Sequence, residues 1–190
     1  MRLGILGGSF DPIHHGHLIA AQLAHEALGL DRVLLVVSAA QPLKSGHGAP
    51  AVHRLRMTEL ASEGIAALAA DGREIARGGT SYTVDTLRGL RDEWPGAELV
   101  LLLGSDAAAE FGRWRDPAGI RDLARVVTFA RGGIAPPDGF ETVAVPAVEI
   151  SSTAIRSRAA RGLSLRGWVP ERVADYISGL ALYQQTGGAG

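Results

Sequence analysis

The chain lacks cysteine, has few aromatic residues and contains a single lysine. Its 190 residues include no Cys, only 5% aromatic residues and, among 19 basic residues, one lysine, Lys44. Without thiols the protein has no disulfide, no cysteine nucleophile and no cysteine-ligated zinc site. Basic charge is therefore carried almost wholly by arginine, which singles out Lys44 for attention.

An excess of charge of either sign is also missing. The 19 Lys and Arg residues nearly balance 20 Asp and Glu residues, which leaves a net charge of -1. Proteins that bind nucleic acids or anionic membranes in bulk carry a strong basic excess. We therefore expect no nucleic-acid partner. Any anion that the protein binds must be held by charged or polar groups at its own site, because the overall charge does not attract it.

Long hydrophobic runs are absent as well. The longest apolar segments, such as residues 33–37 and 99–103, fall far short of the roughly 20 residues that a membrane helix needs. The first six residues reach Gly7-Gly8 too soon for the apolar region of a signal peptide. These features predict a cytoplasmic protein with no membrane partner.

Short apolar runs alternate with longer helical patterns, which is typical of an α/β protein. This order predicts a Rossmann-like open parallel sheet with helices on both faces, in a single domain over residues 1–190 whose last ten or so residues, rich in glycine, are frayed. Ser81 or Thr80 is the expected N-cap of the third helix in the list that follows. The expected strands are residues 3–6, 33–37, 73–76 (weakly), 99–103, 125–130 and 142–145 with 148–150, and the expected helices are residues 18–28, 50–62, 81–94, 152–161 and 170–177.

The most informative segment is the loop of residues 7–17, which follows the first expected strand and leads into a helix. In an open parallel sheet, ligands bind beyond the carboxyl ends of the strands, where a helix start offers free N–H groups to an anion. His14 and His17 are three residues apart, so one helical turn places both imidazoles on one side, where they can donate to phosphate oxygens. The loop therefore predicts a phosphate site and suggests phosphate-transfer chemistry.

Other ligand sites fit this loop less well. It has no Gly-Lys-Ser/Thr of a Walker motif, and Gly4, Gly7 and Gly8 lack the spacing of a dinucleotide fingerprint. The second strand ends in Val-Val-Ser with no acidic residue, which disfavours an NAD-dependent dehydrogenase. Catalytic zinc would need a third protein ligand that no nearby run supplies, so we predict no metal bound by protein residues. A chance polar loop remains the less favoured alternative.

Two motifs carry a family resemblance. The segment Gly8-x-Phe10-Asp11-Pro12-x-His14-x-Gly16-His17 and the segment Ile150-Ser151-Ser152-Thr153-x-x-Arg156 resemble those of the His-x-Gly-His nucleotidyltransferase superfamily, and most closely the bacterial nicotinate-nucleotide adenylyltransferases. The resemblance extends over essentially the whole chain in the order of that family. It includes residues 81–87, Gly104-Ser105-Asp106, Trp114 and Val169-Pro170.

The resemblance implies transfer of the adenylyl group of ATP to nicotinate mononucleotide, which gives nicotinate adenine dinucleotide and pyrophosphate in NAD biosynthesis. A phosphate monoester is largely dianionic at neutral pH, so this nucleophile needs no general base. Mg²⁺ is expected with ATP, held mainly by substrate oxygens and water. Catalysis then consists of aligning two anions and neutralising developing charge.

The resemblance also assigns the site residues. His14 and His17 would be catalytic, and a loop reading Gln41-Pro42-Leu43-Lys44, where the family often has Pro-Pro-His before its basic residue, puts a histidine contact there in doubt. The residues implied for ATP are Gly8, Ser9, Phe10, His14, His17, Asp106, Ser151, Ser152, Thr153 and Arg156, and those implied for nicotinate mononucleotide are Lys44, Thr83, Trp114, Arg115 and Arg131.

Two rival functions share these motifs. Sister nucleotidyltransferases that use nicotinamide mononucleotide, phosphopantetheine or glycerol phosphate carry the same His-x-Gly-His loop, although residues 81–87 and Trp114 resemble the acceptor side of the nicotinate enzyme. A non-catalytic nucleotide sensor of the same fold is the other rival. The intact His14, His17 and Arg156 disfavour it. The sequence does not indicate an oligomeric state.

Overall fold

The computed structural model describes residues 1–40, 48–131, 139–146 and 148–184, without the side chain of Arg131. Six strands form one sheet in the order β3-β2-β1-β4-β5-β6, and every neighbouring pair is parallel. Within the described ranges, no helix is long and apolar enough to cross a membrane. The strands are β1 (Arg2–Gly8), β2 (Arg32–Val37), β3 (Leu68–Asp71), β4 (Glu98–Leu103), β5 (Arg125–Arg131) and β6 (Glu141–Val145).

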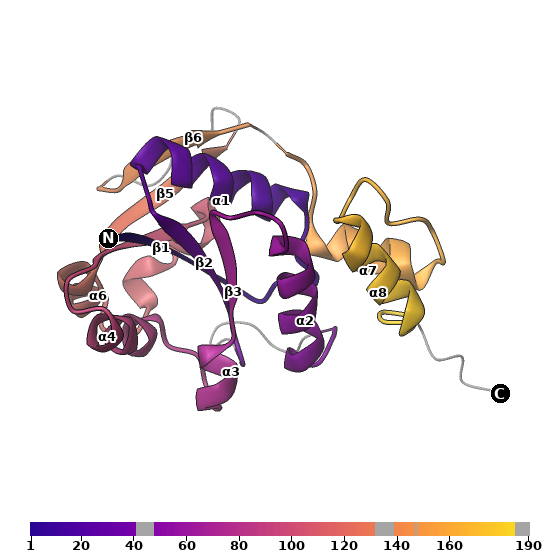
Figure 1. Cartoon of the computed structure of the whole chain (residues 1–190), viewed down its shortest axis with the longest axis horizontal. Helices are drawn as coiled ribbons and strands as arrows, with labels where there is room; N and C mark the ends of the chain where they lie inside the picture. The colour runs from indigo at the N-terminus through magenta and orange to yellow at the C-terminus, as the bar shows by residue number, and fades with distance from the viewer. Residues whose placement is uncertain (41–47, 132–138, 147, 185–190) are drawn as a thin grey trace.

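Helices cover both faces of the sheet, so the predicted Rossmann-like α/β architecture is confirmed (Figure 1). Alternate residues of β2 divide between the two faces: Val33, Leu35 and Val37 join one apolar layer, while Leu34 and Val36 join the other. The first layer packs under α1 (His15–Leu28), α2 (Ala51–Ser62), α7 (Ser152–Ala160) and α8 (Glu171–Gly179), and the second under α4 (Thr83–Glu93), α5 (Ser105–Ala109), the 3₁₀ turn η1 (Phe111–Arg113) and α6 (Pro117–Leu123).

The loop that follows β1 lies where the strand order reverses. β1 pairs with β2 on one side and with β4 on the other. The order reverses here because the chain adds β2 and β3 on one side of β1, and then β4, β5 and β6 on its other side. The Ser38 N–H continues the ladder by donating to the Gly8 carbonyl at 2.9 Å. Such a switch point at the carboxyl ends of the strands is where open α/β sheets bind ligands.

Most predicted elements are present, but one strand was wrongly placed. Residues 73–76 form part of the helix α3 (Arg73–Arg77), and the edge strand β3 is Leu68–Asp71 instead. The segment Leu68-Ala69-Ala70 lacks β-branched residues, so its sequence gives little strand signal, and it is held by pairing with β2. In α3, Glu74 is buried and its carboxylate accepts from the Thr86 hydroxyl at 2.5 Å, a tertiary contact that local pattern cannot reveal.

Two further boundaries differ from expectation. The N-cap of α4 is Tyr82, not Ser81 or Thr80, because the Ser81 hydroxyl instead accepts from the Ala39 N–H at 2.9 Å and ties α4 to the end of β2. Residues 148–150 are not a strand, since β6 ends at Val145. The expected frayed tail largely coincides with residues 185–190, which lie outside the described part of the chain.

Candidate functional site

His14 and His17 lie together at the start of α1. His14 is the N-cap, and its N–H donates to Nδ1 of His17 at 3.3 Å. The two rings are stacked with centroids 3.7 Å apart and an interplanar angle of 25°. The pair is thus on one side of the start of a 14-residue helix, as the three-residue spacing predicts, where the positive end of the helix dipole lies.

Phe10 and Gly8 set the position of this pair. Phe10 is 2% exposed, adopts a positive φ of 46°, and its ring meets the edge of His17 at a centroid distance of 5.1 Å. A Cβ on Gly8 would lie 3.0 Å from two carbons of the Phe10 ring. Only glycine allows the end of β1 to approach the ring so closely, which places these two loop residues in the packing that supports His17.

The start of α7 meets the same loop. The Ser152 hydroxyl donates to the Pro12 carbonyl at 2.9 Å, and the Arg156 guanidinium donates to the Asp11 carbonyl at 2.8 Å. Ser151 is the N-cap and accepts from the Ala154 N–H, so its hydroxyl has a local role. Two helix N-termini therefore lie side by side at the carboxyl edge of the sheet. The fold thus brings together the two segments, residues 8–17 and 151–156, that carry most of the residues implied for ATP.

The Asp11 carboxylate, to which the sequence assigned no role, is a buried junction in the loop. Asp11 is 4% exposed and precedes Pro12 across a cis peptide bond. One of its oxygens accepts from the Gly48 N–H at 2.6 Å; the other accepts from the Ala49 N–H at 3.1 Å and from the Tyr183 hydroxyl at 2.7 Å. Asp11 therefore joins the loop to the residues before α2 and to the C-terminal turn.

Arg54 is a second buried polar residue that sequence reasoning missed. Its guanidinium, completely buried, donates to the carbonyls of Ser9 at 2.7 Å, Ala39 at 3.1 Å and Ala49 at 3.2 Å. Burial lowers the pKa of Arg54, and the nearby Asp11 charge opposes that shift. The three-residue spacing from Met57 was the signal in the sequence that could have indicated its burial, because it places Arg54 on the same buried face of α2. A buried charge without partners is costly, so such an arginine is expected to be hydrogen-bonded.

Three of the residues implied for the acceptor, Thr83, Trp114 and Arg115, lie on the opposite face of the sheet. Thr83 is the first residue of α4, and the Arg115 guanidinium lies 4.7 Å from the ring centroid of the N-cap Tyr82. Arg115 also contacts Asp85 at 3.4 Å. Trp114 follows η1, is half-buried, and has its ring 5.6 Å from that of Phe111. Arg115 thus connects the segment after Trp114 to the start of α4 through Tyr82 and Asp85, and the binding roles assigned to Thr83, Trp114 and Arg115 stay predictions.

The remaining predicted residues are less informative. Asp106 lies in the first turn of α5 beyond β4; its side chain is exposed and does not cap the helix. Lys44 and the unusual loop around it fall within residues 41–47, outside the described residues. Arg131 ends β5, and its side chain is likewise not described. The roles assigned to these three residues stay predictions.

Ser38 is a further polar residue that the sequence did not single out. It follows β2, is 4% exposed, and its hydroxyl has no hydrogen-bond partner among the residues that the structure describes. Strand alternation places it on the face of Leu34 and Val36, the side that packs against α4. The hydroxyl therefore lies on the same face of the sheet as Thr83, a residue implied for nicotinate mononucleotide.

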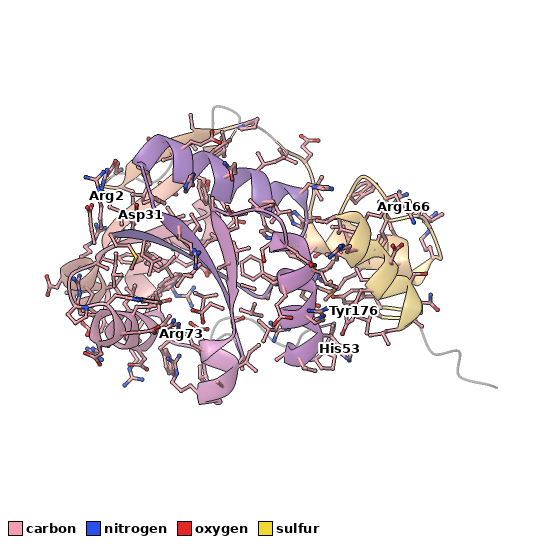
Figure 2. All side chains as sticks on the ribbon, in the orientation of Figure 1. Arg2, Asp31, His53, Arg73, Arg166 and Tyr176 are labelled. Carbon is pink, nitrogen blue, oxygen red and sulfur yellow. The ribbon has the colours of Figure 1, made fainter. Side chains whose placement is uncertain are left out.

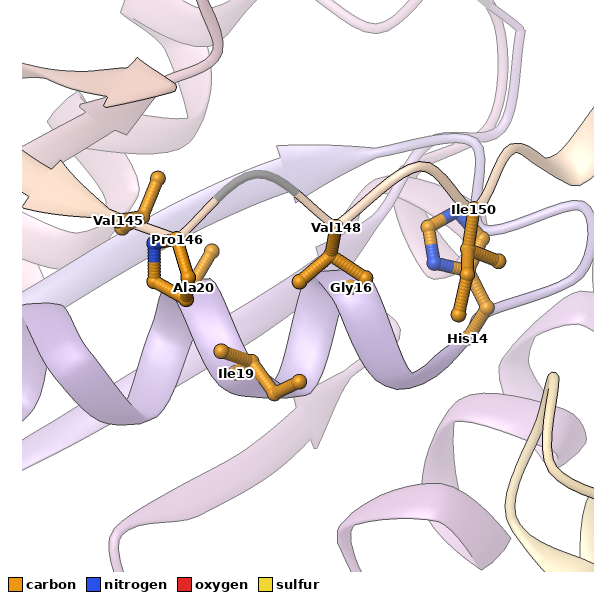
Figure 3. A pocket seen from close by; sticks show the side chains of 8 residues that line it. All are labelled: His14, Gly16, Ile19, Ala20, Val145, Pro146, Val148 and Ile150. Atoms are coloured by element: carbon orange, nitrogen blue, oxygen red, sulfur yellow. The ribbon is translucent and has the colours of Figure 1, made fainter. Parts of the chain in front are cut away.

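The pockets formed by the described residues do not include a substrate-sized cavity at the predicted site. A small pocket of about 10 Å³ lies at the start of α1. Figure 3 shows Val148 and Ile150 over this helix start, with His14 and Gly16 beneath them. A larger hollow of about 670 Å³ contains none of the predicted site residues and is lined by residues of α1 and α2, by Glu63, Ile65 and Leu68, and by residues 170–172. No cluster of three or more potential metal ligands occurs among the described residues.

Comparisons with known proteins agree with this geometry. A cytidylyltransferase-like family model matches residues 5–158. The probable nicotinate-nucleotide adenylyltransferase of Gemmatimonas aurantiaca is 43% identical, over 97% of this chain and 93% of its own. That of Thermus thermophilus is 44% identical, over 97% of this chain and all of its own.

Solved structures give the same fold. The nicotinic acid mononucleotide adenylyltransferase of Plasmodium falciparum, complexed with NaAD, superposes with a TM-score of 0.77 at 18% identity, over 96% of this chain and 97% of that one. A complex of the same protein with APC gives a TM-score of 0.75 at 19% identity, over 96% of each chain. With the sequence relatives above, these findings show that the chain belongs to the nicotinate-nucleotide adenylyltransferase family of cytidylyltransferase-like proteins.

Proposed function

We propose that the protein transfers the adenylyl group of ATP to nicotinate mononucleotide and releases pyrophosphate. Relatives at about 40% identity over nearly their full length are named for this activity. The structural observation that carries the proposal is the meeting of two helix N-termini, those of α1 and α7, at the stacked His14 and His17 pair. Two positive dipole ends, two imidazoles and Arg156 suit a polyphosphate chain.

The reaction requires little proton transfer from the protein. An oxygen of the mononucleotide phosphate forms a bond to the α-phosphorus of ATP, and the bond from that phosphorus to the bridging oxygen breaks, so that its electron pair leaves with pyrophosphate. The attacking phosphate is already ionised at neutral pH. His14 and His17 donate hydrogen bonds to ATP phosphate oxygens and stabilise the charge that develops in the transition state.

ATP enters as its magnesium complex, and the ion belongs to the substrate. The donor set of the described residues fits this, because the buried Asp11 oxygens already accept from two backbone N–H groups and the Tyr183 hydroxyl. The ion supplies neutralisation of the phosphate charge and is held by substrate oxygens and water. The chain itself contributes the helix N-termini and the two histidines.

The acceptor binds on the other side of the switch point. The start of the 11-residue helix α4 presents the backbone N–H of Thr83 toward a carboxylate, and Trp114, half-buried, offers an aromatic face for the cationic pyridine ring. Arg115, Lys44 and Arg131 complete the predicted contacts of this substrate. The mononucleotide phosphate thereby points toward the nucleotide side, where the α-phosphate of ATP lies.

A label experiment tests the proposal. ATP labelled at the α-phosphate is incubated with the protein and with nicotinate mononucleotide, nicotinamide mononucleotide or phosphopantetheine in turn. We expect the label in nicotinate adenine dinucleotide and unlabelled pyrophosphate as the second product. Label in another acceptor alone would move the protein to a sister activity, and no transfer to any acceptor would favour a nucleotide sensor.

A further inference from the structure

Three separate parts of the chain meet at the Asp11 carboxylate. The loop after β1 supplies Asp11, the residues before α2 supply two N–H groups, and the turn after α8 supplies Tyr183, which is 172 residues away in the sequence. Three donors on one buried carboxylate form a strong arrangement, because hydrogen bonds to charged groups exceed those between neutral groups. The carboxylate therefore fixes the loop between the Gly48-Ala49 segment and the turn after α8, neither of which carries a residue implied for ATP.

Tyr183 is held in a conformation that its local sequence does not favour. Its φ is 65°, in the left-handed region that large side chains rarely adopt. A Cβ on Gly48 would lie 3.0 Å from two carbons of the Tyr183 ring, so the ring packs directly on that backbone. Burial and the neighbouring Asp11 raise the pKa of Tyr183, which keeps its hydroxyl protonated as a donor. Backbone strain of this kind persists where surrounding contacts determine the position.

Arg54 fixes the same loop from the other side. It holds the carbonyl of Ser9, two residues before Asp11, together with the carbonyls of Ala39 and Ala49. The loop is thus restrained at Ser9 by Arg54, at the Asp11 side chain by Tyr183, and at the Asp11 carbonyl by Arg156. The next residues along the chain lead directly to His14 and His17.

We infer that Tyr183 is a positioning residue for adenylyl transfer, which acts through Asp11 on the loop that carries His14 and His17. The inference rests on the proposed function. Tyr183 acts through another residue, since its hydroxyl is occupied by the Asp11 carboxylate. A shift of about 1 Å in a reacting group can lower a rate about 100-fold. Loosening the loop therefore lowers kcat before it lowers affinity for the acceptor, whose predicted contacts lie on the α4 face.

Tyr183→Phe tests this with a matched control. The variant removes one hydroxyl and keeps the ring that packs on Gly48. Tyr176→Phe removes the same group from α8, where it bonds to Nδ1 of His53 at 2.9 Å, between α8 and α2 (Figure 2). With ATP saturating and nicotinate mononucleotide varied, we expect Tyr183→Phe to lower kcat by about tenfold or more while KM for nicotinate mononucleotide changes by less than about twofold. We expect Tyr176→Phe to leave kcat within about twofold.

The outcomes separate the claims. A Tyr183→Phe protein that melts at a lower temperature but keeps wild-type kcat would show a purely structural tyrosine and would overturn the inference. Equal losses of kcat in both tyrosine variants would also overturn it, because a general effect of the C-terminal helix would explain them. Wild-type protein that forms no dinucleotide would overturn the proposed function, and the inference with it.

A double-mutant cycle with Asp11→Ala tests the route through the carboxylate. Alanine removes both carboxylate oxygens, so the Tyr183 hydroxyl loses its acceptor. If Tyr183 acts through Asp11, the Tyr183→Phe change lowers kcat by less than about threefold in the Asp11→Ala background. The same loss of kcat in both backgrounds would show that Tyr183 acts by another route and would contradict the inference.

Discussion

Replacing Gly8 by alanine tests how the end of β1 supports the histidine pair. The new Cβ would lie 3.0 Å from two carbons of the Phe10 ring and 3.3 Å from a third. Ordinary contacts between carbon atoms are about 3.5–4.0 Å, so the ring must move by roughly 0.5 Å. The ring is rigid and 2% exposed, and His17 lies against it at 5.1 Å. The displacement is therefore passed on to His17.

The expected magnitudes follow from this geometry. Adding one methyl group to a closely packed region costs about 1–3 kcal/mol of the free energy of unfolding. For a chain of this size, each kcal/mol lowers Tm by about 2–4 °C, so the variant should melt roughly 5 °C below wild type. A half-ångström shift of His17 should lower kcat by about tenfold, since about 1 Å can cost 100-fold.

Thermal unfolding and steady-state kinetics measure the two effects. Gly7→Ala is the control for stability, because a Cβ on Gly7 has no atom within 4 Å. The control should therefore keep the wild-type Tm. A Gly8→Ala variant with wild-type Tm and wild-type kcat would refute the close packing of Gly8 on Phe10 as a determinant of the site.

Three further predictions concern single side chains. His17→Ala should fold and lose adenylyl transfer by about 100-fold or more, because a preorganised donor is removed, and near wild-type kcat/KM would refute its phosphate role. Trp114→Ala should raise KM for the acid and the amide acceptor by a similar factor, since stacking on the pyridine ring is common to both; a selective effect would contradict it. Above about pH 10, unfolded tyrosine loses its proton while Tyr183, whose pKa is raised by burial, keeps it, so stability falls by up to about 1.4 kcal/mol per pH unit. In denaturant titrations, Tyr183→Phe should show a shallower fall, and identical slopes would refute the buried tyrosine.

Local patterns in the sequence predict the parts of the fold that local chemistry determines. The first strand, expected over residues 3–6, is present as Arg2–Gly8. The first helix, expected over residues 18–28, is present and ends at Leu28, where Gly29 adopts the left-handed conformation. The spacing of His14 and His17 likewise predicts that both imidazoles lie on one side of a helix start, and the structure places them together there.

The missed features depend on contacts between distant segments. The bond from Tyr183 to Asp11 spans almost the whole chain, and the three carbonyls bound by Arg54 come from two loops, the one after β1 and the one between β2 and α2. Ser81 was predicted as a helix cap, but its hydroxyl meets the end of β2, 42 residues earlier. These pairings become visible only when the sheet brings the strand ends to one edge.

Competition between acid and amide acceptors tests the central claim most directly. A carboxylate at the start of α4 gains the unpaired N–H groups there, whereas an amide leaves such donors poorly matched at a cost of about 1–3 kcal/mol each. With equal amounts of nicotinate and nicotinamide mononucleotide and limiting ATP, mass spectrometry of the products should show at least about ten parts of nicotinate adenine dinucleotide to one of NAD. Equal products, or an excess of NAD, would contradict the assignment of the acid as the acceptor.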